Sequence, residues 1–299
     1  MRDIRDACFD VICSYAEQNK NVVILTNDMG VFGLQKLKQN FPKQFINVGV
    51  AEQNMINVAA GLSESGKHVF VYGISSFITF RCFEQIKVNI CSMNLPVTII
   101  GIGSGFSFSF DGPTHHGIQD IGVMRTIPEI EIYNPCDFHS TFNCVSDTIK
   151  NNVPCYLRIE KGSLPDFYSD NDNYLWKQLR KFSETTCIVS TGFTTHKAVI
   201  IADEFKNVSV FDICKIKPIC ENLLMLLSRF KKIICLEEHS LTGGIGSLLS
   251  EVATDREWNT RIKRVSISDV QCLFYGDRLW LQEKHNLSYD KVKEEIKNI

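Results

Sequence analysis

A single carboxylate stands where an apolar run gives way to a helical pattern. The run Phe45–Val50 is mostly apolar, and the helical pattern Glu52–Glu64 follows almost at once. Ligands of α/β sheets gather beyond the carboxyl ends of strands, and a helix N-terminus stabilises negative charge. Glu52 is therefore a candidate catalytic or binding residue. The alternative is an ordinary acidic residue in a first helical turn, where acidic residues are common.

A second stretch gathers one carboxylate and two imidazoles. It reads Asp-Gly-Pro-Thr-His-His-Gly from Asp111 to Gly117 and follows the apolar run Val97–Ile102. Histidine titrates near neutrality and suits acid–base catalysis, which makes His115 a candidate. A structural turn, in which Asp111 and Thr114 only bond the backbone, is equally open. A metal site is disfavoured, because two adjacent histidines cannot easily face one ion and no further ligand pair is at hand.

Alternating strands and helices must position these residues. In the first half the pattern predicts strands at 21–26, 45–50, 68–72, 97–102, 129–133 and 153–158, and helices at 5–19, 52–64, 77–93 and 138–150. In the second half it predicts strands at 187–190, 208–211, 232–237 and 263–267, and helices at 195–205, 221–230, after 246 and from 288. Strands that alternate with helices of this length indicate parallel sheets.

We therefore predict an α/β fold with two consecutive parallel-sheet domains. A polar and aromatic stretch begins at Tyr168 and separates the two series. Domain boundaries fall in such stretches. The predicted division is a first domain at 1–168, a linker at 169–185 and a second domain at 186–299.

The composition favours a soluble globular protein. Of 299 residues, 44% are hydrophobic and 22% charged, and the formal net charge is −2. This charge gives no indication of a nucleic-acid or anionic-membrane partner. No apolar run reaches the roughly 18 residues that span a bilayer, and the N-terminus lacks the apolar core of a signal peptide. We expect a cytoplasmic protein without membrane or nucleic-acid partners.

The twelve cysteines are expected to be free thiols. Several lie within apolar runs, as small buried hydrophobic residues do, and no Cys-x-x-Cys pair occurs. Neither disulfides nor a metal site is expected from them in a reducing compartment.

Several motifs, in one order, carry a family resemblance. They are Val-Gly-Val-Ala-Glu-Gln-Asn at 48–54, Ser-Phe-Ile-Thr-Phe-Arg-Cys-Phe at 76–83, Asp-Gly-Pro-Thr-His at 111–115 and Met-Arg-Thr-Ile-Pro at 124–128. So arranged, they resemble the pyrimidine-binding domain of transketolases and of 1-deoxyxylulose-5-phosphate synthases. The second half, with Glu237–Gly246, is similar to the C-terminal domain of that family. The resemblance covers nearly the whole chain and implies thiamine diphosphate and Mg²⁺ as cofactors. It also implies transfer of a two-carbon ketol unit from a ketose phosphate to an aldose.

The resemblance assigns cofactor contacts to five residues. Glu52 would meet N1′ of the aminopyrimidine and so activate the cofactor. Phe80 would stack on the pyrimidine, with Phe77 and Phe83 completing an aromatic wall; ordinary core packing is the alternative for all three. Asp28 aligns with a family carboxylate at the boundary of cofactor and subunit, and a simple turn residue is its alternative.

The resemblance also implies a sugar-phosphate site. Asp111 would bond a sugar hydroxyl, and His115 would line the same channel near the phosphate end as a catalytic and binding residue. Arg158 and Lys161 stand where the family holds basic residues for the substrate phosphate, although a solvated strand end is equally open. Gly103 occupies a position where transketolases carry a histidine, so the donor sugar stays open.

The motif by which the family anchors diphosphate and magnesium is missing from the sequence. This motif is Gly-Asp-Gly with a downstream Asn. The nearest run, Tyr275–Arg278, lacks the second glycine, and Gly243–Gly246 lacks a metal-binding carboxylate at the proper spacing. Half a site cannot hold the charged diphosphate. We therefore predict a separate diphosphate-binding subunit of similar size, which would hold most of the Mg²⁺ ligands in an α₂β₂ assembly. No metal ligand is expected in this chain.

Three alternatives stay open. One is a condensation starting from pyruvate, like that of 1-deoxyxylulose-5-phosphate synthase. Another is the β subunit of a 2-oxoacid dehydrogenase, which the sugar-directed run Asp111–His115 disfavours. The last is a catalytically inert scaffold with the same fold, which the joint presence of Glu52, Phe80, Asp111 and His115 disfavours.

Overall fold

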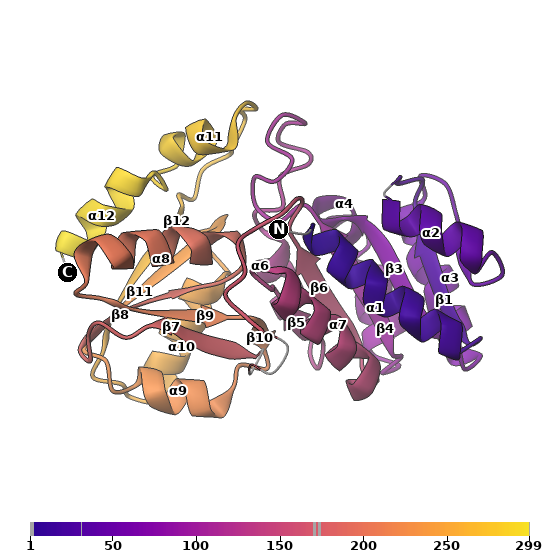
Figure 1. Ribbon diagram of the computed structural model, residues 1–299, viewed down its shortest axis with the longest axis horizontal. Coiled ribbons are helices and arrows are strands. Elements are labelled where there is room, and N and C mark those ends of the chain that lie inside the picture. The colour runs from indigo at the N-terminus through magenta and orange to yellow at the C-terminus, as the bar shows by residue number, and fades with distance from the viewer. Residues whose placement is uncertain (1–2, 31, 170–171, 173–174, 299) are drawn as a thin grey trace.

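The computed structural model describes residues 3–30, 32–169, 172 and 175–298, and contains two β-sheets that lie side by side (Figure 1). Parallel pairing dominates both sheets, and helices cover both faces of each. The predicted α/β fold class is thereby confirmed. Among the described residues, no helix is both long and apolar enough to cross a bilayer. The twelve cysteines are free thiols, all buried except the half-buried Cys220.

The first sheet has seven strands in the order β10-β5-β6-β4-β3-β1-β2. Its strands from the first half are β1 (Val22–Thr26), β2 (Phe45–Asn47), β3 (His68–Ile74), β4 (Val97–Ile102), β5 (Glu131–Tyr133) and β6 (Cys155–Ile159). These six run parallel to their neighbours. The edge strand β10 (Lys215–Lys217) comes from the second half of the chain and pairs antiparallel with β5. The carboxyl ends of six strands therefore meet at one edge.

Alternating side chains of the first sheet feed two hydrophobic clusters. Val22 and Ile24 pack with α1 (Ile4–Gln18) and α7 (Phe138–Asn151), which cross the front of the sheet in Figure 1. Val23 and Leu25 point to the opposite face. The helices on the first face also include α2 (Phe32–Asn40). Those on the opposite face are α3 (Glu52–Glu64), α4 (Ser75–Phe80), α5 (Phe83–Gln85), the π-helix η1 (Ile86–Cys91) and α6 (Asp120–Arg125).

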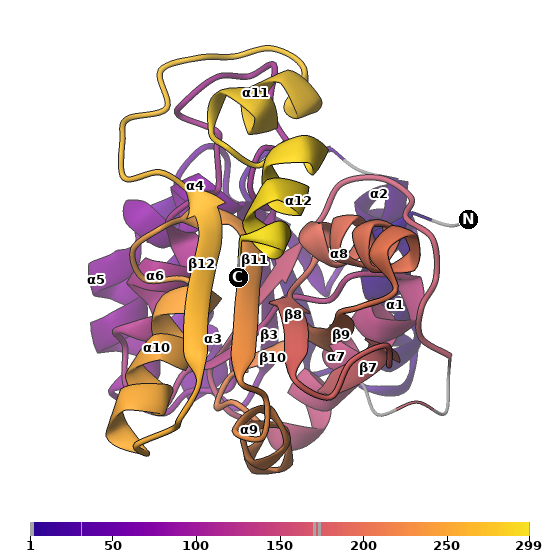
Figure 2. The ribbon, with the colours of Figure 1, turned by 90° about the vertical axis from the view of Figure 1, so that its left-hand side faces the viewer.

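The second sheet has five strands in the order β12-β11-β8-β9-β7 (Figure 2). They are β7 (Trp176–Arg180), β8 (Thr186–Ser190), β9 (Ser209–Ile213), β11 (Lys232–Ser240) and β12 (Arg261–Ile267). Helices α8 (Phe193–Phe205) and α12 (Tyr289–Lys297) cover one face, while α9 (Glu221–Leu227) and α10 (Ile245–Asp255) cover the other. The short helix α11 (Arg278–Lys284) lies beyond the sheet, next to a loop of the first half.

One hydrophobic cluster joins the two halves. It contains Val71 of the first sheet, Val189 and Phe211 of the second, and Leu223 of α9, all fully buried. Burial of a large apolar side chain stabilises a fold by roughly 1.5–3 kcal/mol, so this shared cluster fixes the two sheets against each other. The relative placement of loops from the two halves is therefore set by the core.

The structure adds elements that the pattern did not predict. Helices α2, α6 and α11 and strands β7 and β10 are short, and a periodicity argument needs a longer window. Strand β7 lies inside the segment predicted as a linker and pairs antiparallel with β9. The predicted helix 77–93 is divided into α4, α5 and η1, with a turn at Arg81 and Cys82. That turn directs Arg81 toward the edge described next.

Candidate active site

The candidate residues gather where the parallel strands of the first sheet end. Asp28 follows β1, Glu52 follows β2, and α4 begins directly after β3. The loop 103–117, which carries Asp111 and His115, follows β4, and Lys161 follows β6. Because these strands are parallel, their carboxyl ends share one edge. The sheet topology thus brings together residues from five separate connections.

Glu52 opens helix α3 and is only 3% exposed. Its Oε1 accepts a hydrogen bond from Nδ2 of Asn27 at 3.0 Å, and its Oε2 accepts one from Nη1 of Arg81 at 3.1 Å. The Arg81 side chain is 46% exposed. The inner oxygen is therefore fixed by a buried amide, whereas the outer oxygen faces a partner that solvent reaches. An exposed ion pair contributes at most about 1 kcal/mol, so a ligand can replace the bond to Arg81 at small cost.

A continuous line of contacts leads from Glu52 to Lys161. The Arg81 guanidinium lies over the Phe77 ring at 4.3 Å, and that ring meets His115 edge-on at 4.8 Å. His115 also contacts the Phe108 ring at 6.2 Å, and Nζ of Lys161 lies 5.2 Å from the same ring. Glu52, Phe77, His115 and Lys161, four of the residues expected from the sequence, therefore belong to one surface.

Two of the three phenylalanines face this surface. Phe80 is 40% exposed and directly precedes Arg81, the partner of Glu52. Phe77 contacts both Arg81 and His115. Phe83, in contrast, packs against the hydrophobic cluster that joins the two halves. An exposed ring beside a buried carboxylate offers a planar ligand a face on which to stack, and Phe83 supports this face from below.

Asp28 and Asp111 are both exposed. The backbone of Asp28 adopts a positive φ of 66°, and its Oδ1 accepts a hydrogen bond from Nδ2 of Asn47 at 3.2 Å. Asp111 lies at the tip of the 103–117 loop, where its backbone N–H donates to the Phe108 carbonyl at 3.1 Å. Both carboxylates are accessible, Asp28 near Glu52 through β1 and Asp111 on the side of His115.

The adjacent histidines have different surroundings. His115 is half-buried, contacts Phe77, and has its Nδ1 3.0 Å from Oγ1 of Thr114. His116 is buried against the Phe106 ring, with centroids 5.1 Å apart, and burial lowers the pKa of its imidazole. Only His115 is thus available at the surface that contains Glu52.

The position of Arg158 differs from the sequence expectation of a phosphate ligand. The residue is 4% exposed, and its Nε donates to Oδ2 of Asp120 at 2.8 Å. Its Nη2 donates to the carbonyls of Gly117 at 2.7 Å and of Glu238 at 3.4 Å. A phosphate contact would have to break a buried ion pair, which is costly. Arg158 therefore holds the base of the 103–117 loop, and only Lys161 presents its ammonium group to the surface.

Side chains at the start of α4 fix the 103–117 loop. Oγ of Ser75 donates to the Gly103 carbonyl, and Oγ of Ser76 donates to the Thr114 carbonyl, both at 2.9 Å. Gly103 has a φ of 95°, and a Cβ atom there would collide with the Phe108 ring. The glycine at this position is therefore needed for the packing of Phe108, which in turn contacts His115 and Lys161.

The residues present fit the aminopyrimidine half of thiamine diphosphate. A buried carboxylate with one exchangeable bond and an exposed aromatic ring are the groups that a protonatable planar heterocycle requires. They do not provide for the diphosphate and its metal. Among the described residues, no cluster of three or more His, Cys, Asp or Glu side chains has an arrangement that could hold a metal ion.

Sequence reasoning missed three residues of this surface: Asn27, Arg81 and Phe108. Asn27 and Phe108 carry no distinctive signal, since each depends on a contact between separate connections. Arg81 had one, because it is the lone cation within the aromatic stretch 76–83 and lies one residue beyond Phe80. A search for a counter-charge to Glu52 would have found it.

Comparisons with known proteins agree with this geometry. Residues 1–166 match the family model of the transketolase pyrimidine-binding domain, and residues 176–283 match that of the transketolase C-terminal domain. The chain is 31% identical to a subunit of the apulose-4-phosphate transketolase of Phocaeicola vulgatus, over 86% of each chain. It is 32% identical to the 1-deoxy-D-xylulose-5-phosphate synthase of Corynebacterium glutamicum, over 86% of this chain but 43% of that enzyme.

A solved structure gives the same result for the fold. The structure described as a split gene transketolase, inactive beta4 tetramer, superposes with a TM-score of 0.87 and 28% identity, over 99% of this chain and 97% of that one. Both halves and their mutual arrangement are thus matched. The chain belongs to the transketolase family.

Proposed function

We propose that this chain is the pyrimidine-binding subunit of a split, thiamine-diphosphate-dependent transketolase. With a partner subunit it would transfer a two-carbon ketol unit from a ketose phosphate to an aldose. The observation that carries the proposal is the buried carboxylate of Glu52, which keeps one oxygen toward the exposed Arg81 and Phe80. The relatives named as transketolase subunits support the reaction class.

Glu52 would hold a proton at N1′ of the bound aminopyrimidine. Asn27 fixes the carboxylate from the inner side, so the remaining oxygen has one defined direction. Phe80 would lie against the pyrimidine, with Phe77 beside it, while Phe83 supports them. Thiamine diphosphate, when bound, supplies the nucleophilic carbon and the electron sink for ketol transfer. This chain contributes placement and the proton.

The sugar phosphate would lie along the 103–117 loop. Asp111 is exposed there and can accept a hydrogen bond from a sugar hydroxyl. His115 can donate or accept a proton near neutral pH and contacts Phe77, which connects it to the cofactor side. Lys161 carries the accessible ammonium group on this surface and would bind the substrate phosphate.

The other half of the cofactor site would come from a partner subunit. The sequence has no Gly-Asp-Gly motif, and charged diphosphate needs backbone N–H groups or a cation. The partner would hold diphosphate and most Mg²⁺ ligands, in an α₂β₂ assembly. The relatives that are named as single subunits of larger transketolases, and the solved split gene transketolase, support a separate partner chain.

The test is reconstitution with a chain that carries Gly-Asp-Gly and its downstream Asn. The mixed subunits, supplied with thiamine diphosphate and Mg²⁺, are given xylulose 5-phosphate with an aldose acceptor, or pyruvate with an aldehyde. We expect consumption of the ketose phosphate and a new ketose product. Decarboxylation of pyruvate without ketose turnover would favour a 1-deoxyxylulose-5-phosphate-synthase-like reaction, to which the similarity with the Corynebacterium glutamicum enzyme points. Turnover of neither donor would favour the inert scaffold.

A further inference from the structure

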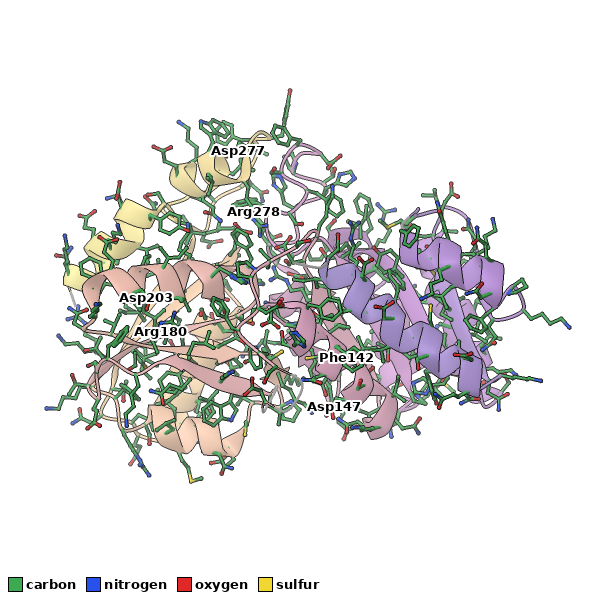
Figure 3. The ribbon with its side chains drawn as sticks, viewed as in Figure 1. Phe142, Asp147, Arg180, Asp203, Asp277 and Arg278 are labelled. Carbon is green, nitrogen blue, oxygen red and sulfur yellow. The ribbon has the colours of Figure 1, made fainter. Side chains whose placement is uncertain are left out.

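Arg278 connects the C-terminal helix α11 to both halves of the molecule. It is the first residue of α11, and its side chain is 17% exposed. Its Nη2 donates to Oε2 of Glu160 at 2.8 Å and to Oε2 of Glu238 at 2.6 Å. Glu160 follows β6 of the first sheet, and Glu238 belongs to β11 of the second. Figure 3 shows Arg278 near the place where the 103–117 loop and α11 meet.

The first acceptor, Glu238, holds the 103–117 loop directly. Its Oε2 accepts a hydrogen bond from the backbone N–H of Phe106 at 2.8 Å. A Cβ atom at Gly105 would collide with this carboxylate, so the loop backbone lies against it. Oε1 of Glu238 accepts from Nε2 of Gln282 at 2.5 Å. The carboxylate is thus fixed by α11 on one side and fixes the loop on the other.

The second acceptor, Glu160, holds the opposite border of the same surface. Its Oε1 accepts from the backbone N–H of Lys161, and its Oε2 accepts from Oγ of Ser104, both at 2.9 Å. Burial alone would raise the pKa of Glu160, but the bond from Arg278 holds it below the usual range. Glu160 therefore stays ionised and couples the start of the loop to the residue that carries the surface ammonium group.

Without a guanidinium between them, the two buried carboxylates would repel each other. Glu160 is 2% and Glu238 4% exposed, and both bond to the same nitrogen atom. Removal of one partner of a buried ion pair leaves an uncompensated charge, which is strongly destabilising. The guanidinium also lies 3.5 Å over the Phe193 ring, which fixes its plane. Loss of Arg278 should therefore displace the carboxylates and the backbone that they hold.

We propose that Arg278 is a positioning residue for the sugar-phosphate side of the site, because it holds the 103–117 loop and Lys161 in register through Glu238 and Glu160. The inference rests on the proposed function for its kinetic consequence but not for its structural one. The loop is also bonded to the segment before α11, by the N–H of Gly276 to the Ser109 carbonyl at 3.0 Å. Arg278 thus sets the alignment of a loop that has a second attachment.

The structural test measures amide hydrogen exchange in the isolated chain. Arg278→Gln is compared with Arg278→Lys and with Arg180→Gln, the last being a matched control whose exposed ion pair with Asp203 lies far from the loop in Figure 3. We expect exchange at residues 103–117 to rise at least about tenfold in Arg278→Gln, less in Arg278→Lys, and not at all in Arg180→Gln. Unchanged loop exchange in Arg278→Gln would overturn the inference.

The kinetic test uses the reconstituted pair. We expect Arg278→Gln to raise KM for the ketose phosphate about tenfold while kcat falls less than threefold, because the residue aligns binding groups and touches no reacting atom. Thiamine diphosphate affinity should stay unchanged. Equal loss of kcat and cofactor affinity would contradict a positioning role. If Arg278→Gln does not fold, Glu238→Gln/Arg278→Gln removes the opposed charges together and should fold, with the same KM effect. An inactive wild-type pair would reject the proposed function, whereas loop exchange still decides the role of Arg278.

Discussion

Each sheet has an acid near the junction of a strand with a helix, and the two acids have different environments. Glu52 precedes the body of α3, and its outer oxygen bonds to the half-exposed Arg81. Glu237 of β11 faces the start of α10, where both oxygens accept backbone N–H groups, from Ile245 at 2.7 Å and Gly246 at 2.9 Å. The same type of scaffold therefore leaves one carboxylate open to a ligand and uses the other to cap a helix.

The comparison explains why chemistry is expected only in the first half. The capping bonds of Glu237 satisfy N–H groups that a helix start otherwise leaves unpaired, so no anion-binding site is left at the glycine-rich run 243–246. At the first edge, by contrast, aromatic rings, an imidazole and an ammonium group stay at the surface. The second half contributes through the acceptors that position the 103–117 loop.

The largest expected effect is that of Glu52→Gln. Because a neutral amide cannot exchange a proton with the bound ring, ketol transfer by the reconstituted pair should fall by about two orders of magnitude or more. Steady-state rates with xylulose 5-phosphate measure this. The fold should stay intact by circular dichroism. A variant with more than half of wild-type turnover would mean that Glu52 resembles Glu237 and is only structural.

Glu237→Gln should have the opposite profile. Loss of the charge weakens two hydrogen bonds to backbone donors, which should cost about 2–3 kcal/mol of stability, since hydrogen bonds to charged groups contribute about 1.5–3 kcal/mol each. Chemical denaturation of the isolated chain measures the free energy of unfolding. Turnover per folded subunit should stay within a factor of two of wild type. Selective loss of turnover would show that the second edge is also catalytic.

A buried acid of the second sheet should make stability depend on pH. Burial raises the pKa of Asp212 from 3.8 to about 7, although Thr195 and Tyr168 donate to it. The folded state then binds a proton that the unfolded state has released, so stability is greatest at low pH and is lost as pH rises toward and through about 7. We expect wild-type unfolding free energy to drop between pH 5 and pH 8 by about 2 kcal/mol.

Asp212→Asn should remove most of this decrease, because the amide does not titrate. Denaturation midpoints of both proteins at pH 5, 6, 7 and 8 provide the check. Parallel curves for wild type and variant would show that Asp212 is ionised throughout this range in the folded protein.

The smallest effect is expected at Lys161. Lys161→Ala should raise KM for a phosphorylated donor about fivefold to tenfold, as expected for one charge-assisted contact. KM for a donor without phosphate should not change. Lys181→Ala, at an exposed lysine of the second half, is the matched control. An equal rise for both kinds of donor would indicate that Lys161 supports the loop and does not bind phosphate.

The sequence predicted the parts of this account that depend on local pattern. The alternation of apolar strands and helices indicated two parallel sheets, and Glu52, His115 and Lys161 were identified because each follows a predicted strand. The failures concern contacts between distant segments. Arg158 looked like a surface cation at a strand end, because nothing in the sequence shows that Asp120 and two carbonyls surround it. The network of Arg278 joins residues more than a hundred positions apart and leaves no periodic signal.

Binding of thiamine diphosphate tests the central claim most directly. Isothermal titration in the presence of Mg²⁺ would compare this chain alone, a Gly-Asp-Gly-bearing partner alone, and the two together, each with wild-type chain and with Glu52→Gln. We predict tight binding only in the mixture, weakened by Glu52→Gln. Tight binding and ketose turnover by this chain alone would contradict the account, because the site would then be complete within one polypeptide.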